Sequence, residues 1–226
     1  MNFALAQTRN PHPWLRGLVG TLLACVFAFF TAIPEAQAQG CTVNTDGTGL
    51  GPVFESCSEN KNSGNTTTIS IAVPPSVQSG NLLIASINTD GAPNFNTPAG
   101  WNLVQVVRAS GNEASLAVFY RISPGGEPAN YTFTWTGAEE VVGFIMRFSG
   151  VTGNYVFTTA SGTNTPVAPS VNTNGNATST NNLILRLSAW DDDDEADDPA
   201  TVITGHSNIN QDASGGGGGT ASGAAA

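Results

Sequence analysis

Charge is scarce in this chain of 226 residues, and positive charge is the scarcest. Only 11% of the residues are charged, and seven Lys and Arg face 17 Asp and Glu, for a formal net charge of −10. So few basic groups exclude a protein that grips nucleic acid by charge, because the acidic surface repels phosphate. The low charge also excludes coiled coils and Lys/Glu-rich helical bundles, and Gly, Asn, Ser and Thr are abundant instead.

Side chains for catalysis are nearly absent as well. The chain has one lysine, Lys61, and His206 is the only histidine after residue 38. No nucleophile-elbow motif surrounds a serine, so a Ser-His-Asp triad has no support. A zinc site normally needs at least three ligands in defined spacing. We therefore expect a protein that is not an enzyme.

One catalytic alternative stays open, which is glycoside hydrolysis by two carboxylates. The candidates are Glu113, Glu127, Glu139 and Glu140. The pair Glu139-Glu140 is more simply interpreted as a hairpin turn before a strand. A hydrolase is therefore the least favoured of the functions considered.

Residues 1–38 have the three-part order of a secretory signal peptide. Arg9 and Arg16 supply the positive start, a long apolar run follows, and small residues precede position 39. We predict cleavage after Ala38 and a secreted, periplasmic or cell-surface protein without a membrane span after cleavage. Two alternatives are a retained membrane anchor and a lipoprotein cleaved at Cys25.

The cysteines fit an oxidising compartment. The chain has three, and signal removal leaves Cys41 and Cys57. An even pair outside the cytosol predicts a disulfide bond between them. It would close the polar segment 39–65 and stabilise it by about 3 kcal/mol in the chain-entropy picture.

Apolar side chains alternate with polar ones along six runs that follow this segment. They are Ile69–Val73, Leu83–Ile87, Ala114–Arg121, Tyr131–Thr136, Val142–Phe148 and Leu183–Ala189. Alternation with period two, broken by Gly, Pro and Asn, is typical of half-buried strands. The pattern predicts an all-β domain over 66–211, an antiparallel two-sheet β-sandwich of jelly-roll or immunoglobulin-like type.

The end of the chain differs in composition. Residues 212–226 are mostly Gly, Ala and Ser, which have little to bury and much conformational entropy to lose. We expect a flexible tail there. A weak internal echo, in which Pro75–Ile84 resembles Pro169–Leu185, suggests a sequence that ends before its closing strands. The alternative is a natural tail.

An acidic run, Asp191–Asp198, directly follows the last alternating segment. Seven carboxylates in eight residues repel one another unless they are screened, and Ca²⁺ takes six to eight oxygen ligands. The candidate calcium ligands are Asp191, Asp192, Asp193, Asp194 and Glu195. Their spacing does not match the helix-loop-helix calcium pattern. The alternative is a solvated acidic loop that maintains solubility.

Tryptophans offer a second kind of binding site. Trp101, after a turn, and Trp190, beside the acidic run, could each stack on a sugar ring. Packing in the core or at a sheet edge is the alternative for both. Trp135 alternates with threonines on one strand and is expected in the core.

Several stretches together resemble a β-sandwich module of exported bacterial surface proteins of the agglutinin and pilus-biogenesis type. They are Gly80–Ser86, Pro98–Val104, Tyr120–Trp135, Phe148–Val151 and Leu183–Asp194 with Gly205-His206. The resemblance implies an extracellular, structural or adhesive role, with surface glycans or other surface and pilus proteins as partners. In that family a further strand pair usually follows the Gly-rich segment, and this sequence lacks it. A carbohydrate-binding module that uses Trp101 or Trp190 is the alternative function.

Overall fold

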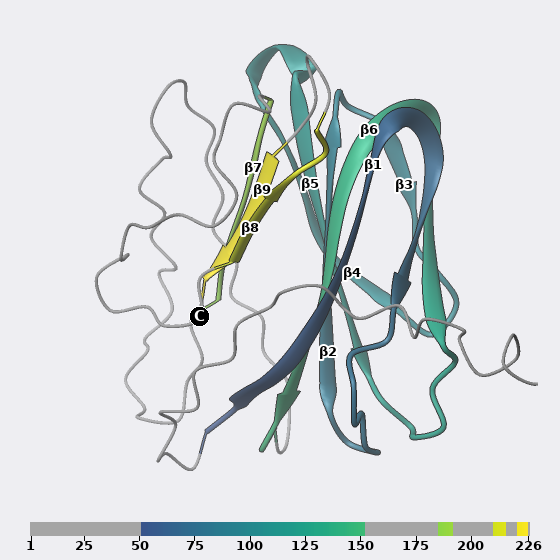
Figure 1. Ribbon diagram of the computed structural model, residues 1–226, viewed down its shortest axis with the longest axis vertical. Helices are drawn as coiled ribbons and strands as arrows, with labels where there is room; N and C mark the ends of the chain where they lie inside the picture. Colours follow the sequence, from purple (N-terminus) through teal and green to yellow (C-terminus); the bar gives the residue numbers. More distant parts are fainter. Residues whose placement is uncertain (1–50, 152–184, 192–209, 216–220, 226) are drawn as a thin grey trace, which may run out of the picture. The chain divides into compact units, whose positions relative to one another are not determined.

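The computed structural model describes residues 51–151, 185–191, 210–215 and 221–225, and these residues form β-strands almost throughout (Figure 1). The one other element among them is a 3-10 turn, η1 (Ser110–Asn112). Every strand pair in this part of the chain is antiparallel. The all-β, antiparallel character predicted from the alternating runs is therefore confirmed.

The larger sheet has six strands. Five of them lie in the order β1-β6-β2-β5-β4, and β3 pairs separately with β6. Their bounds are β1 (Val53–Ala72), β2 (Leu82–Asp90), β3 (Asn94–Asn96), β4 (Asn102–Arg108), β5 (Ala114–Ile122) and β6 (Asn130–Ser149). Strands β2 and β6 lie inside this sheet, which explains why so many of their side chains are buried.

Strand β6 is one continuous strand where the sequence predicted two. The expected runs Tyr131–Thr136 and Val142–Phe148 both belong to it, so the hairpin turn expected at Glu139-Glu140 is wrong. The strand that pairs with β6 changes near Gly137. This residue has a φ of +90°, which glycine adopts at little cost. Residues before this point pair with β3, and residues after it pair with β2.

Strand β1 runs beside β6 along its whole length, with irregular register near the middle. Its first half pairs with the second half of β6, as in Phe54 opposite Phe148, and its second half pairs with the first, as in Ile71 opposite Tyr131. The strand starts at Val53, inside the segment 39–65 that we expected to be separate from the strands. Backbone pairing with β6 holds these polar residues in extended form, although they lack alternation.

The smaller sheet has three strands in the order β7-β9-β8. They are β7 (Arg186–Trp190), β8 (Asn210–Ala213) and β9 (Ala221–Ala225). The tail 212–226 was expected to be flexible, yet it contains the end of β8 and all of β9. A strand ladder is made of backbone hydrogen bonds, so small side chains do not prevent it.

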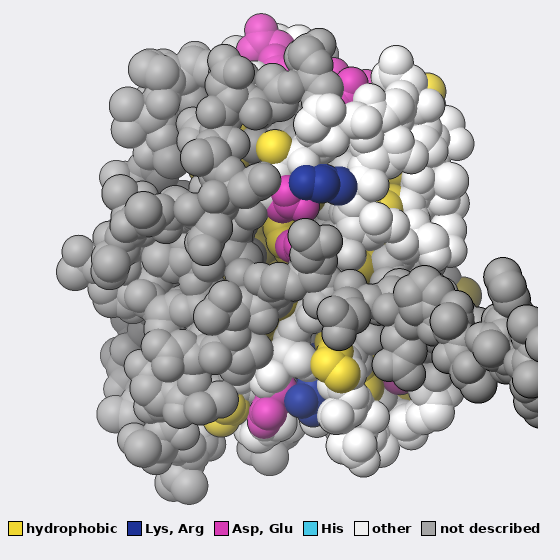
Figure 2. Space-filling model, in the orientation of Figure 1, with side chains coloured by type: hydrophobic (Ala, Val, Ile, Leu, Met, Phe, Trp, Pro, Cys, Tyr) yellow, Lys and Arg dark blue, Asp and Glu magenta, His cyan; other side chains and the backbone are white. Residues whose placement is uncertain are grey.

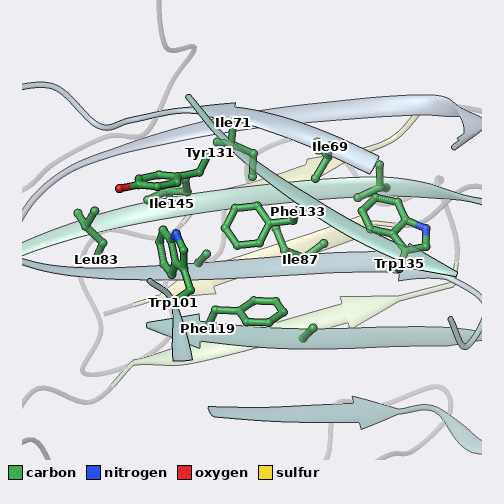
Figure 3. Packing of buried hydrophobic residues seen from close by; sticks show 13 residues of the cluster. Ile69, Ile71, Leu83, Ile87, Trp101, Phe119, Tyr131, Phe133, Trp135 and Ile145 are labelled. Carbon is green, nitrogen blue, oxygen red and sulfur yellow. The ribbon is translucent and has the colours of Figure 1, made fainter. Parts of the chain in front are cut away.

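The first core cluster collects side chains from the second half of β1, from both halves of β6, and from β2 and β5 (Figure 3). Its members are Ile69, Ile71, Leu83, Ala85, Ile87, Trp101, Ala117, Phe119, Tyr131, Phe133, Trp135, Val141 and Ile145. Phe133 lies at its centre, with ring centroids 5.4 Å from Phe119 and 5.3 Å from Trp101. Trp135 is in this cluster, as predicted.

The second core cluster lies on β1, β2 and β6 and is smaller. It contains Phe54, Cys57, Leu82, Ile84, Met146 and Phe148, and Leu185 and Leu187 of the β7 region pack against it. Alternation along β2 sends Leu83 to the first cluster and Leu82 and Ile84 to the second. The larger sheet is thus apolar on both faces.

Within the described ranges, no helix has the length and apolar character needed to cross a membrane.

Candidate functional site

A tight turn fixes the first acidic residue of the candidate site. Strand β2 ends at Asp90, and Gly91 follows with φ of +77°. The Gly91 amide donates to the carbonyl of Glu113 at 2.8 Å, and the Ser115 hydroxyl donates to the Gly91 carbonyl at 2.7 Å. This Asp-Gly pair forms a turn because glycine adopts a positive φ without strain.

Glu139 reaches the same turn from β6. A Cβ atom placed on Gly91 would lie 2.7 Å from Oε2 of Glu139, so the carboxylate occupies the space that a side chain at position 91 would take. Glycine is therefore needed here for two reasons, its backbone conformation and the close approach of Glu139. As a result, Glu139 is close enough to Asp90 for the charge of Asp90 to act on it.

Asp191 is the third carboxylate, and it is the first residue after β7. Its carboxyl is hydrogen-bonded to that of Asp90. Burial first, then the charge of Asp191 and this hydrogen bond, and then the charge of Glu140 raise the pKa of Asp90 above its ordinary value of 3.8. Burial and then the charge of Asp90 raise the pKa of Glu139. We call Asp90, Glu139 and Asp191 the acidic rim.

The acidic rim connects part of the predicted calcium site to residues that were not predicted. Asp191 belongs to the acidic run, whereas Asp192, Asp193, Asp194 and Glu195 lie outside the described residues. Within the part of the chain that the structure describes, no group of three or more His, Cys, Asp or Glu side chains is arranged to hold a metal ion. The rim brings negative charges together, and the pKa values of Asp90 and Glu139 are raised as a result of burial and of these charges.

A second polar group joins β8 to the larger sheet. Lys61 Nζ of β1 lies 2.6 Å from Oδ1 of Asp212, with side chains 45% and 10% exposed. Two residues later the Ser214 hydroxyl donates to Oε2 of Glu140 at 2.9 Å. Figure 2 shows acidic side chains gathered at the upper end of the displayed face, and basic groups in contact with acidic ones farther down.

The two candidate sugar-binding tryptophans have different surroundings. Trp101 is 5% exposed, and its ring meets Tyr131 edge-on at 5.1 Å between centroids. This position corresponds to the core-packing alternative left open by the sequence. Trp190 ends β7 next to Asp191 and is only partly buried. Of the two residues, Trp190 is therefore the more exposed.

The candidate hydrolase carboxylates are divided between two environments. Glu139 belongs to the rim and Glu140 binds Ser214, whereas Glu127 has a side chain only 4% exposed. Its Oε2 accepts a hydrogen bond from the Tyr131 hydroxyl and lies 3.4 Å from Nε of Arg121. These contacts give Glu127 a structural role at the edge of the first core cluster.

Cys57 is buried in the second core cluster, 6% exposed. Cys41 and His206 lie outside the described residues. The Cys41–Cys57 disulfide therefore stays a prediction.

Comparison with protein-family models, curated proteins and solved structures finds no match for this chain.

Proposed function

We propose that this protein is an exported, non-catalytic β-sandwich module with a structural or adhesive role at the cell surface. The observation that carries the proposal is the contrast between an apolar, aromatic interior and the acidic rim of Asp90, Glu139 and Asp191. Proteins of this kind bind through loops held by a rigid body of strands. The export signal and the predicted disulfide between Cys41 and Cys57 agree with a location outside the cytosol.

The sandwich part of the proposal rests on the two halves of β1 and β6. One layer would consist of β2, β4 and β5 with the first half of β1 and the second half of β6. The other layer would consist of β3 with the remaining halves. Support comes from the first core cluster, because it takes side chains from both sets. A crystal structure in which the two sets lie side by side in one flat layer would contradict this arrangement.

Export and adhesion are tested on the full chain expressed in a bacterial host. We expect N-terminal sequencing of the exported protein to begin at Gln39. The labelled mature protein should then bind to bacterial cells or to arrayed surface glycans. A protein that stays in the cytosol with both mature thiols reactive, or that binds no cell and no glycan, would contradict the proposal.

We further propose that the acidic run holds Ca²⁺ through Asp191, Asp192, Asp193, Asp194 and Glu195, with Asp90 beside them. The contact between Asp90 and Asp191 supports this, because two carboxyls that touch gain from a shared cation. A ligand that binds only the folded state raises its stability. We expect millimolar Ca²⁺ to raise the melting temperature by several degrees, more than Mg²⁺ does, and Asp191→Asn to lose most of the rise. If Ca²⁺ caused no shift in melting temperature, the proposed calcium site would be contradicted.

Carbohydrate binding is the alternative, and the position of Trp190 favours it. A partly exposed indole next to a carboxylate can stack on a sugar ring while the acid accepts hydrogen bonds from its hydroxyls. Titration with sugars should change the tryptophan fluorescence of the wild type and of Trp101→Phe, but not that of Trp190→Ala. Unchanged fluorescence in the wild type would dismiss this function.

A further inference from the structure

One outward sheet face carries threonine, serine and asparagine side chains and no charge. It lies on β3, the first half of β6 and the second half of β1, where apolar residues point into the first core cluster and alternate residues point the other way. The outward residues are Asn94, Asn96, Thr132, Thr134, Thr136, Thr68 and Ser70. All of them are exposed except Thr134, which is half-buried. We call these seven residues the threonine face.

Strand pairing puts the threonine face in rows. Thr134 is opposite Thr68 on one side and Asn96 on the other. The Asn96 amide donates to the Thr134 hydroxyl at 3.1 Å, which orders both side chains. The other outward pairs are Thr132 with Ser70 and Thr136 with Asn94. Polar groups therefore repeat about every 4.8 Å across the strands and about every 6.7 Å along them.

The threonine face is also held rigidly. The residues that alternate with its members on β6, such as Phe133 and Trp135, are buried in the first core cluster. Threonine is branched at Cβ, so few χ1 rotamers are open to it even in solvent. Side chains that are ordered before they bind lose little conformational entropy when they meet a rigid surface.

The absence of charge selects an uncharged partner. The chain has a formal net charge of −10, yet no residue of the threonine face is ionisable. Ligand sites for sugars are commonly lined by aromatic side chains, whereas the aromatic rings of β6 point into the first core cluster (Figure 3). Ice is uncharged and rigid, and its prism face presents oxygen atoms at two repeats close to those of the threonine face.

We propose that the threonine face binds the surface of ice. Its hydroxyl and amide groups take the places of water molecules in the outermost layer of the lattice, and the threonine methyl groups fill the gaps between them. Each contact is weak, but matching repeats let many contacts form at once. This function goes beyond the adhesive role and does not involve the acidic rim.

The test measures how the exported full chain divides between liquid and ice that grows slowly from a dilute solution. We expect the wild type to be concentrated in the ice and to slow ice recrystallisation. Thr132→Lys places a charged, strongly hydrated group on the threonine face, and most of the ice-bound fraction should be lost. Asn102→Lys is the matched control, because it adds the same charge at an exposed residue of β4 and should leave the ice-bound fraction unchanged.

Wild-type protein that stays in the liquid overturns the proposal, whether or not the variants fold. Ice binding that survives in Thr132→Lys, with circular dichroism unchanged, also overturns it, because another surface would then be responsible. Retention on crystalline cellulose without uptake into ice would assign the face to a polysaccharide instead. A wild-type dimer that Thr132→Lys dissociates, without ice binding, would assign it to a second copy of the chain. Binding to cells and glycans is measured above the freezing point, so the adhesive role holds or fails independently.

Discussion

The two core clusters differ in size and in the residues that pack against them. The first is built from 13 buried residues of four strands and the turn residue Trp101, and its aromatic rings contact one another. The second has six buried residues on β1, β2 and β6, and its partners around β7 include the partly buried Leu185 and Leu187. Because stabilisation follows the apolar area removed from water, the first cluster should contribute most of the free energy of unfolding.

The largest effect is expected in the first core cluster, at Phe133. This ring is 1% exposed and packs against Phe119 and Trp101. Phe133→Ala would leave a cavity that rigid strands cannot fill, so we expect a loss of about 3–5 kcal/mol in the free energy of unfolding. Urea unfolding monitored by circular dichroism measures it. A loss below about 1 kcal/mol would mean that the first cluster is not the main core.

Glu127 tests the polar edge of the same cluster. Glu127→Ala removes the carboxylate that accepts from the Tyr131 hydroxyl and pairs with Arg121. Two partly buried polar groups would then lose this partner. We expect a loss of about 2–3 kcal/mol, since unpaired buried polar groups cost more than the pair itself provides. Glu127→Gln is the matched control, because it keeps the shape and an acceptor. Equal losses in both variants would show that the charge, not the hydrogen bond, matters.

Leu187 gives the matching measurement for the second core cluster. It is partly buried, so Leu187→Ala removes less apolar area than Phe133→Ala does. We expect a loss of about 1–2 kcal/mol by the same urea experiment. If this loss equalled that of Phe133→Ala, the first cluster would not contribute more to the free energy of unfolding than the second.

Alternation along the chain was enough to predict the strands of the first cluster. Ile69 and Ile71, or Phe133 and Trp135, are spaced by two residues and face the same interior. The continuous course of β6 could not be predicted, because Gly137 and the two glutamates after it have the composition of a turn. Pairing with β1 on one side overrides that local signal. The same holds for β9, whose backbone pairs although its side chains are small.

The acidic rim was predictable only at one of its three positions. Asp191 stood out within a run of acids, but Asp90 looked like an ordinary turn residue and Glu139 like part of a hairpin. Their meeting depends on the register between strands and on the space above Gly91, neither of which is encoded locally. Trp101 shows the reverse case, since a turn before it suggested a rim position and the structure places it in the core.

The smallest effect is expected at Asp90, where the rim meets β7. Its raised pKa means that the folded state disfavours the charged form. This group therefore lowers stability above its folded pKa, and the penalty shrinks as the pH falls through that pKa and disappears below 3.8, the value of an unperturbed Asp. Asp90→Asn removes the charge and can donate to Asp191.

With EDTA present, we expect Asp90→Asn to be more stable than the wild type near pH 7, by less than about 1 kcal/mol because the rim is largely solvated. The difference should shrink to nothing near pH 3, below the unperturbed value of 3.8. Urea unfolding at the two pH values measures it. A variant less stable than the wild type near pH 7 would show that the Asp90 charge stabilises the fold, which would contradict the raised pKa of this group.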